Sequence, residues 1–136
     1  MKKLDTILLI DDDQATNFIH KFILEKEQCA KNIICKQSGQ DALNYLTSKV
    51  DNKYPQTYII FMDIKMTGMN GWEFIEEYKK IDHKQKGEKV VIMLSTSSDP
   101  LDKEKAKAIS QINRFISKPL TADVVGAIIR ENFSVD

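Results

Sequence analysis

The feature that most constrains the fold is an apolar run at residues 58–62, Tyr-Ile-Ile-Phe-Met, which ends at Asp63. A short, continuous apolar run stopped by turn residues is typical of a strand that is buried on both faces of a parallel sheet. Ligands of open α/β sheets bind beyond the carboxyl ends of the strands. Asp63 is therefore expected where chemistry takes place, and its partners should come from the ends of other strands.

Length and charge limit what kind of protein this is. The 136 residues suffice for one domain and one core, so we expect a single domain over 1–136 without an output domain. Lys plus Arg and Asp plus Glu number 20 each, so nothing points to nucleic acid or to an anionic membrane. No apolar run approaches the roughly 18 residues of a membrane span, and the N-terminus lacks a signal-peptide core. We expect a cytoplasmic protein.

Cysteine and histidine give no metal-binding pattern. Cys29 and Cys35 have neither metal-ligand spacing nor a nearby histidine, so we interpret them as reduced structural thiols. His20 and His83 are isolated in the sequence, and we interpret each as structural or solvated.

Apolar strand-like runs alternate with helix-like segments along the whole chain. The other strands are predicted at 6–10, 31–36, 90–94 and 113–117, and the helices at 14–28, from Ser38-Gly39 through Leu46, from Trp72, at 101–112 and after Thr121. Five strands alternating with five helices imply right-handed crossovers and a parallel sheet covered on both faces. We therefore predict a doubly wound α/β fold with the flavodoxin-like strand order 2-1-3-4-5.

Two of the predicted helices differ in apolar content. In the segment 14–28, helical spacing of Phe18, Ile19, Phe22 and Ile23 predicts an amphipathic helix that packs these side chains on the sheet. The segment 101–112 is dominated by charged residues and has little apolar surface. We expect that helix to be held weakly and to shift easily.

The predicted strand order brings several polar residues together. Asp11 and Asp12 follow the first strand and lie beside Asp63, while Ser95 and Lys118 follow the fourth and fifth strands. Crowded carboxylates raise one another's pKa unless a cation neutralises them, and Mg²⁺ prefers such oxygen ligands. This set suits a covalent aspartyl-phosphate: Asp63 attacks phosphorus, Mg²⁺ and Lys118 hold two phosphoryl oxygens, and the Ser95 hydroxyl donates to the third.

Four motifs in order resemble the response-regulator receiver domains of two-component signalling, in particular the single-domain chemotaxis type. They are Leu-Ile-Asp-Asp-Asp at 9–13, Met-Asp-Ile-Lys-Met-Thr-Gly-Met-Asn-Gly at 62–71, Leu-Ser-Thr-Ser at 94–97 and Phe-Ile-Ser-Lys-Pro-Leu at 115–120. Together they extend over nearly the full length of the chain.

The resemblance assigns roles to individual residues. It implies that Asp63 is the phosphoacceptor and that Asp11 and Asp12 form the acidic pair, with Asp12 favoured as the direct Mg²⁺ ligand. The backbone carbonyl of Lys65 supplies a further ligand. Ser95 takes the place of the switch hydroxyl and Lys118 that of the phosphate-binding lysine. Phe115 falls where the family has its switch aromatic.

The resemblance also implies partners. A histidine kinase or a histidine phosphotransfer protein donates the phosphoryl group, and a downstream protein binds the face made by the fourth helix, fifth strand and fifth helix. Activation in the family is a population shift at that face, which agrees with a weakly held fourth helix. Neither the kinase nor the target can be named from the sequence.

One residue departs from the family pattern. Thr67 stands where the family usually has proline and is followed by Gly68, so we expect a looser loop without loss of chemistry. In the same alignment the side chains of Lys65 and Ser97 flank the phosphoryl site, where they influence how fast water reaches the aspartyl-phosphate.

Two other kinds of protein were weighed against the receiver. A haloacid-dehalogenase-like phosphatase also uses an aspartate at a strand end, Mg²⁺ and a lysine, but it needs a second acid two residues after the nucleophile, where this chain has Lys65. A receiver-like interaction module that is never phosphorylated would not need the complete acidic site. A nucleotide-binding protein would need a glycine-rich phosphate loop, which the sequence lacks.

Overall fold

A single five-stranded sheet forms the centre of the molecule. The computed structural model describes residues 4–81, 90–96 and 100–132. The strands are parallel, in the order β2-β1-β3-β4-β5. Their bounds are β1 Leu4–Ile10, β2 Ala30–Lys36, β3 Thr57–Asp63, β4 Val90–Ser95 and β5 Arg114–Ser117. The predicted fold class and strand order are confirmed.

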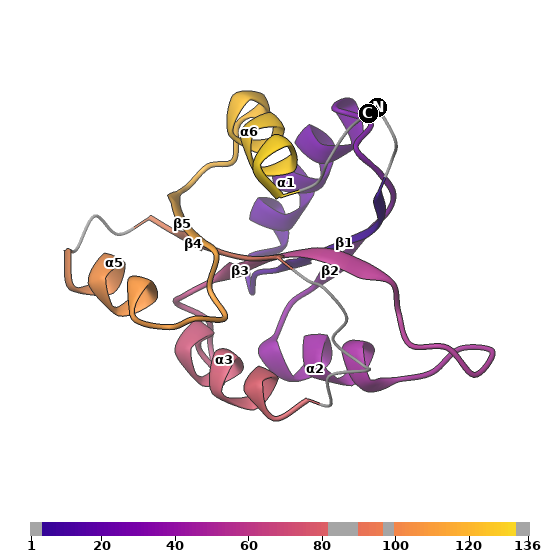
Figure 1. Ribbon diagram of the computed structural model, residues 1–136, viewed down its shortest axis with the longest axis horizontal. Coiled ribbons are helices and arrows are strands. Elements are labelled where there is room, and N and C mark those ends of the chain that lie inside the picture. Colours follow the sequence, from indigo (N-terminus) through magenta and orange to yellow (C-terminus); the bar gives the residue numbers. More distant parts are fainter. Residues whose placement is uncertain (1–3, 82–89, 97–99, 133–136) are drawn as a thin grey trace.

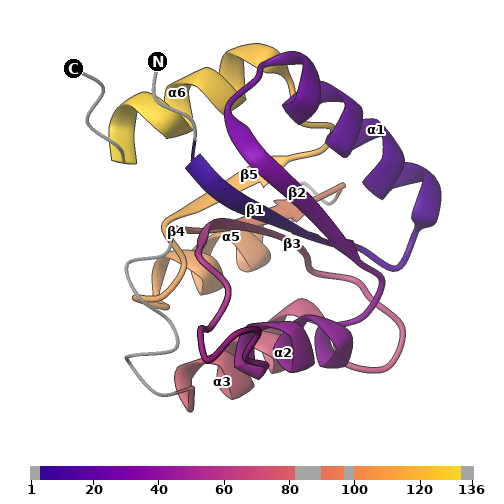
Figure 2. The ribbon, with the colours of Figure 1, turned by 90° about the vertical axis from the view of Figure 1, so that its right-hand side faces the viewer.

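Helices cover both faces of this sheet. Helices α1 and α6 lie on one side, and α2, α3 and α5 lie on the other (Figure 1). The turned view of Figure 2 shows the same two layers with the sheet between them. The bounds are α1 Gln14–Lys26, α2 Gly39–Thr47, α3 Gly71–Lys79, α5 Pro100–Lys107 and α6 Ala122–Asn132.

The two layers enclose two separate hydrophobic cores. Alternation along β1 and β3 sends Leu8 and Ile60 toward α2 and α3, while Ile7 and Phe61 face α1 and α6. All four of these side chains are buried, as a strand covered on both faces requires. The apolar run that suggested a central strand is thus the middle of the sheet.

Polar residues before the helices fix where they begin. The Asp13 side chain accepts from the backbone N–H of Ala15 and caps α1, and Ser38 caps α2 in the same way. Asn70 and Glu73 form a reciprocal capping box at the start of α3. The N-terminal caps therefore set the positions of the helices next to the strand ends.

The predicted inward face of α1 is wrong except at Ile23, which is half-buried and packs against the core. Phe18, Ile19 and Phe22 are 71%, 52% and 60% exposed, and the helix buries Asn17, His20 and Leu24 instead. The side-chain amide of Asn17 donates to the backbone carbonyls of Asp11 and Lys36, and the His20 Nε2 accepts from the backbone N–H of Leu120. These bonds satisfy the amide nitrogen of Asn17 and the Nε2 of His20, whereas the buried Oδ1 of Asn17 has no hydrogen-bond partner within the described structure. The inward face of α1 therefore did not have to be wholly apolar.

The helix predicted at 101–112 is shorter in the structure. It ends at Lys107, and the chain continues in turns with bonds from the Ile109 N–H to the Ala106 carbonyl and from the Ile112 N–H to the Ile109 carbonyl. These turns bring Ile112 into the core and lead directly into β5. Only Ala106 of α5 is buried, which confirms that this helix contributes little apolar surface.

Some sequence predictions fall on residues outside the described ranges. These are His83 and most of the charged connection before β4, and also Ser97. Cys29 is buried, Cys35 is half-buried, and neither forms a disulfide. Among the described residues, no helix is both long and apolar enough to cross a membrane.

Candidate functional site

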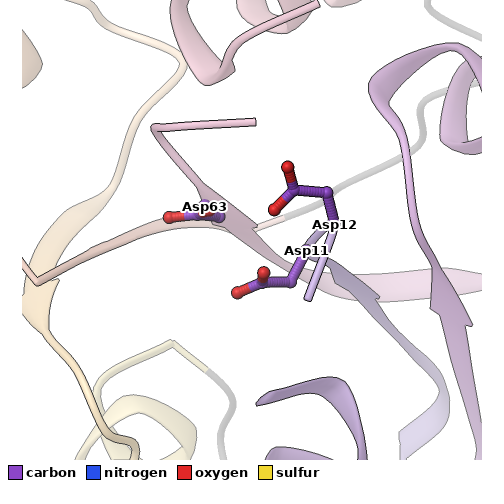
Figure 3. Close-up of side chains that lie close together, drawn as sticks. All are labelled: Asp11, Asp12 and Asp63. Carbon is purple, nitrogen blue, oxygen red and sulfur yellow. The ribbon is translucent and has the colours of Figure 1, made fainter. Parts of the chain in front are cut away.

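Three aspartates converge at the carboxyl ends of β1 and β3. Each of Asp11, Asp12 and Asp63 offers one carboxylate oxygen, and these oxygens all lie within 4.8 Å of one another. Their side chains enter the same space from adjacent strands (Figure 3). The adjacency follows from the strand order, since β1 and β3 pair directly up to Ile10 and Met62.

Lys118 closes this cluster from the end of β5. Its Nζ lies 2.6 Å from Oδ2 of Asp11 and 3.1 Å from Oδ1 of Asp63, and its side chain is only 12% exposed. The backbone N–H of Lys118 donates to the carbonyl of Ser95 at 2.9 Å, which ties the lysine to the end of β4. The Lys118–Pro119 peptide bond is cis. One ammonium is thus shared between two carboxylates.

The charges of this cluster shift the pKa values of its members. Burial and the neighbouring charge of Asp11 raise the pKa of Asp63, and Lys118 only partly offsets that rise. Burial disfavours the charged form of Lys118, but its bonds to Asp11 and the charge of Asp63 outweigh this and raise its pKa. The site therefore keeps its cation and carries an excess of negative charge.

Both carboxylate oxygens of Asp11 accept hydrogen bonds. Oδ1 accepts from the backbone N–H of Asp13 at 2.9 Å, and Oδ2 accepts from Lys118. The buried side chain of Asn17 donates to the Asp11 backbone carbonyl at 2.9 Å. Asp11 is thereby fixed in place, which leaves Asp12 as the better candidate for direct metal ligation.

Asp12 contacts the loop that follows β3. Its Oδ2 accepts from the backbone N–H of Thr67 at 2.9 Å and from the Thr67 hydroxyl at 3.0 Å. Proline could make neither bond because it has no N–H and no hydroxyl. The departure from the family pattern at Thr67 therefore adds two contacts to the site.

Gly71 allows the same loop to return closely to the end of β3. A Cβ at this position would lie 2.7 Å from the backbone oxygen of Asp63 and 2.9 Å from Cα of Ile64. The N–H of Gly71 donates to the Ile64 carbonyl at 2.8 Å. Gly68 has a φ of +77°, the left-handed region that favours glycine. Both glycines are thus required by the shape of the loop around Asp63.

Ser95 and Lys65 lie at the same edge of the sheet, whereas Phe115 lies within β5. Ser95 is buried at the end of β4, where the preceding residue, Leu94, pairs with Asp63. Lys65 and Thr67 line an open hollow of about 490 Å³ together with Asp12 and Trp72. Phe115 pairs with Met93 and packs, half-buried, against the core beneath α5.

The donor set fits a hard divalent cation. The oxygens of Asp11, Asp12 and Asp63 come from carboxylates, and Mg²⁺ takes one or two such ligands while keeping several waters. The open hollow beside Asp12 leaves room for those waters. Lys118 contacts Oδ1 of Asp63, and a carboxylate has about four lone-pair positions, so the lysine does not prevent Asp63 from binding a metal together with Asp11 and Asp12.

Comparison with known proteins identifies the family. The response regulator receiver domain family matches residues 7–130. The chain belongs to this family. Its receiver fold is similar to that of a two-component response regulator from Cytophaga hutchinsonii, with 34% sequence identity, a TM-score of 0.83 and coverage of 96% of this chain and 97% of that one.

Other solved receiver structures share the fold. A response regulator receiver protein from Dyadobacter fermentans is 25% identical, with a TM-score of 0.84 and coverage of 96% and 98%. The Vibrio cholerae chemotaxis protein CheY4 is 18% identical, with a TM-score of 0.77 and coverage of 96% and 99%, and shows likeness of fold alone. A search of curated proteins finds no match to this receiver domain.

Two residues that shape the receiver site were missed from the sequence. Asn17 was missed because the aromatic residues of α1 suggested a different inward face. The helical spacing of Asn17, His20 and Leu24 was the signal for the true inward face. Thr67 was singled out only as a missing proline, and the donors that it adds were overlooked. Both act on the acidic pair, through its backbone or its carboxylate.

Proposed function

We propose that this receiver domain is a cytoplasmic phosphorylation switch in which Asp63 accepts a phosphoryl group in the presence of Mg²⁺. The observation that supports this most is the position of Lys118, whose ammonium contacts both Asp11 and Asp63 beside the oxygen of Asp12. A nucleophile, an acidic metal site and a fixed cation at one edge of the sheet are the parts that phosphoryl transfer requires.

The proposed reaction uses each residue at its own position. A carboxylate oxygen of Asp63 attacks phosphorus, a new oxygen–phosphorus bond forms, and the bond from phosphorus to the donor breaks, so its electron pair leaves with the donor. Lys118 moves from the carboxylate of Asp63 to a phosphoryl oxygen, and the Ser95 hydroxyl donates to another. When bound by Asp11, Asp12, Asp63 and the Lys65 carbonyl, Mg²⁺ supplies positive charge for the phosphoryl oxygens.

The proposed donor is a phosphohistidine of a histidine kinase or a histidine phosphotransfer protein. The exposed side chains of Phe18, Ile19 and Phe22, here called the α1 patch, offer it an apolar docking surface. Helix α1 begins at Gln14, two residues after Asp12, so a protein on this patch lies near the acidic cluster that contains Asp63. Because the α1 patch lies close to Asp63, we assign it to the phosphohistidine donor and not to the downstream target protein.

The proposed output passes through the face made by α5, β5 and α6, at the β5 edge of the sheet. Helix α5 buries only Ala106, so it can move at little cost when Ser95 is drawn toward the phosphoryl group. Phe115 lies half-buried beneath α5 and can turn inward as the switch aromatic. The altered face of α5, β5 and α6 then binds a target protein.

A phosphatase is the main competing function. Lys65 occupies the position where such an enzyme needs its second acid, and its side chain is exposed beside the hollow. Because position 65 is not a carboxylic acid, it cannot protonate the leaving group as such an enzyme requires. This favours an aspartyl-phosphate that persists over catalytic turnover of phosphomonoesters.

Incubation with acetyl phosphate and MgCl₂, followed by intact mass spectrometry, tests the proposal. We expect the wild type to gain one phosphoryl group, the Asp63→Asn variant to gain none, and the control Asp41→Asn, at an exposed residue of α2, to behave as the wild type. Steady release of product from phosphomonoesters would indicate the phosphatase. Absence of any adduct on the wild type would indicate a module that is not phosphorylated.

A further inference from the structure

Thr67 makes an unusual double contact with the acidic site. Two donors of this one residue, its backbone N–H and its hydroxyl, converge on a single oxygen of Asp12, at 2.9 and 3.0 Å. The two residues are 55 positions apart in the sequence, so the contact joins the end of β1 to the loop after β3. Donors to an ionised carboxylate make stronger hydrogen bonds than neutral pairs do.

The contact holds Asp12 in the orientation that a metal ligand needs. With Oδ2 of Asp12 bound to Thr67, a carboxylate oxygen of Asp12 lies within 4.8 Å of the oxygens of Asp11 and Asp63. A carboxylate has about four lone-pair positions, so two donors on Oδ2 leave the other oxygen able to bind a cation. Asp12 stands at the open hollow and not in the buried part of the cluster, so without these donors its side chain has more rotational freedom.

Asp11 does not depend on this loop. Its two oxygens are held by the backbone N–H of Asp13 and by Lys118. The loop contact therefore acts on one member of the acidic pair alone. A change at Thr67 should leave the ion pairs of Lys118 intact.

We infer that Thr67 is a positioning residue for the metal site: its hydroxyl and N–H fix the Asp12 carboxylate so that Mg²⁺ binds without first ordering that side chain. This inference rests on the proposed metal site. Residues that orient a metal ligand typically change metal affinity by about 10- to 100-fold when they are removed. Loss of the hydroxyl alone keeps the N–H bond, so the effect should lie near the lower end of that range.

Titration of the 136-residue chain with MgCl₂, followed through backbone amide chemical shifts, gives the dissociation constant directly. Thr67→Val keeps the shape of the side chain and removes the hydroxyl, and we expect Mg²⁺ to bind roughly tenfold more weakly. Thr67→Ser restores a hydroxyl without the methyl group, and its dissociation constant should return close to that of the wild type. The same spectra show that each variant is folded.

Thr47→Val is the matched control. The Thr47 hydroxyl also makes a hydrogen bond, to the carbonyl of Leu43 at 2.8 Å, but it lies at the end of α2, away from the acids. Its Mg²⁺ affinity should equal that of the wild type. An unchanged or tighter dissociation constant for Thr67→Val would overturn the inference, and so would a serine variant as weak as the valine variant.

Phosphorylation by acetyl phosphate separates this inference from the proposed function. If the wild type binds Mg²⁺ but forms no adduct, the proposed function fails, and Thr67→Val still shows whether Thr67 positions Asp12. If the wild type forms the adduct and the affinity for Mg²⁺ is the same in all variants, the function stands and the role of Thr67 is refuted.

Discussion

Lys118 neutralises part of an acidic cluster that would otherwise be costly to bury. Two carboxylates, those of Asp11 and Asp63, are within reach of its single ammonium, and all three side chains are largely shielded from water. Removal of one partner from a buried ion pair leaves an uncompensated charge, and that loss costs more than the pair itself gains. Lys118 therefore matters for stability as well as for the proposed chemistry.

Replacement of Lys118 by methionine should destabilise the protein in magnesium-free buffer at neutral pH. We expect the free energy of unfolding to fall by about 3 kcal/mol, because the two carboxylates remain without their cation. Urea denaturation measures this change in the free energy of unfolding. The control Lys79→Met removes an exposed ion pair with Glu76 and should cost less than about 1 kcal/mol. Equal losses in the two variants would contradict the ion-pair explanation.

His20 links stability to pH from the buried side of α1. Burial lowers its pKa from 6.5, and the charge of Lys118 lowers it further while Asp11 opposes the shift. Because the folded-state pKa lies below the unfolded value, the unfolded chain binds the proton first. The stabilisation is thus complete above the unfolded pKa and decreases as the pH falls toward the folded one.

The His20→Gln variant should lose this dependence. Wild-type stability should fall between about pH 7.5 and pH 5.5, and the fall should be smaller in the variant because glutamine does not titrate. Denaturation curves at both pH values give the difference. A fall of the same size in the variant would show that His20 is not the group responsible.

The α1 patch should matter for a protein donor and not for a small one. Phe22→Ser removes an aromatic side chain that is 60% exposed, so the fold should tolerate it. We expect transfer from a histidine phosphotransfer protein to slow roughly tenfold, as for an interface anchor, with unchanged labelling by acetyl phosphate.

Val50→Ser is the control for this prediction. Val50 is 72% exposed in the connection between α2 and β3, at the opposite end of the strands from the acids. Transfer rates should not change. Equal slowing by both variants, or slower labelling of Phe22→Ser by acetyl phosphate, would argue against docking on the patch.

Helix α5 should open more readily than α6. It buries Ala106 alone, whereas α6 buries Val125, Ile128 and Ile129. Local opening is easiest where few apolar contacts are lost. Hydrogen–deuterium exchange should therefore show faster exchange of the α5 amides. Equal protection of the two helices would remove the physical basis for a mobile signalling face.

Most of the fold was predictable because the strands are unambiguous. The runs ending at Ile10 and Asp63 are buried on both faces, so apolar content alone identifies them, and the alternation with helices then fixes the order. The same order brings Asp11 and Asp12 to Asp63 without knowledge of any side-chain contact. That the chain is one domain without an output domain stays a prediction.

Two features of the helices could not be predicted from the sequence. Burial of Asn17 and His20 depends on backbone groups of Asp11, six residues away, and of Lys36 and Leu120, 19 and 100 residues away. Hydrophobic periodicity has no information about such partners, so it placed the aromatic residues of α1 on the wrong side. The end of α5 was missed because Ile109 and Ile112 continue the apolar spacing of a helix. In the structure these two residues lie in turns and pack against the core from there.

Mapping of the labelled residue tests whether Asp63 is the phosphoacceptor. After incubation with acetyl phosphate and MgCl₂, borohydride reduces an aspartyl-phosphate to homoserine, and peptide mass spectrometry locates the change. We expect homoserine at residue 63 only, in a reaction that requires Mg²⁺. Homoserine at residue 11 or 12, or none at any position, would contradict the assignment of Asp63 as the phosphoacceptor.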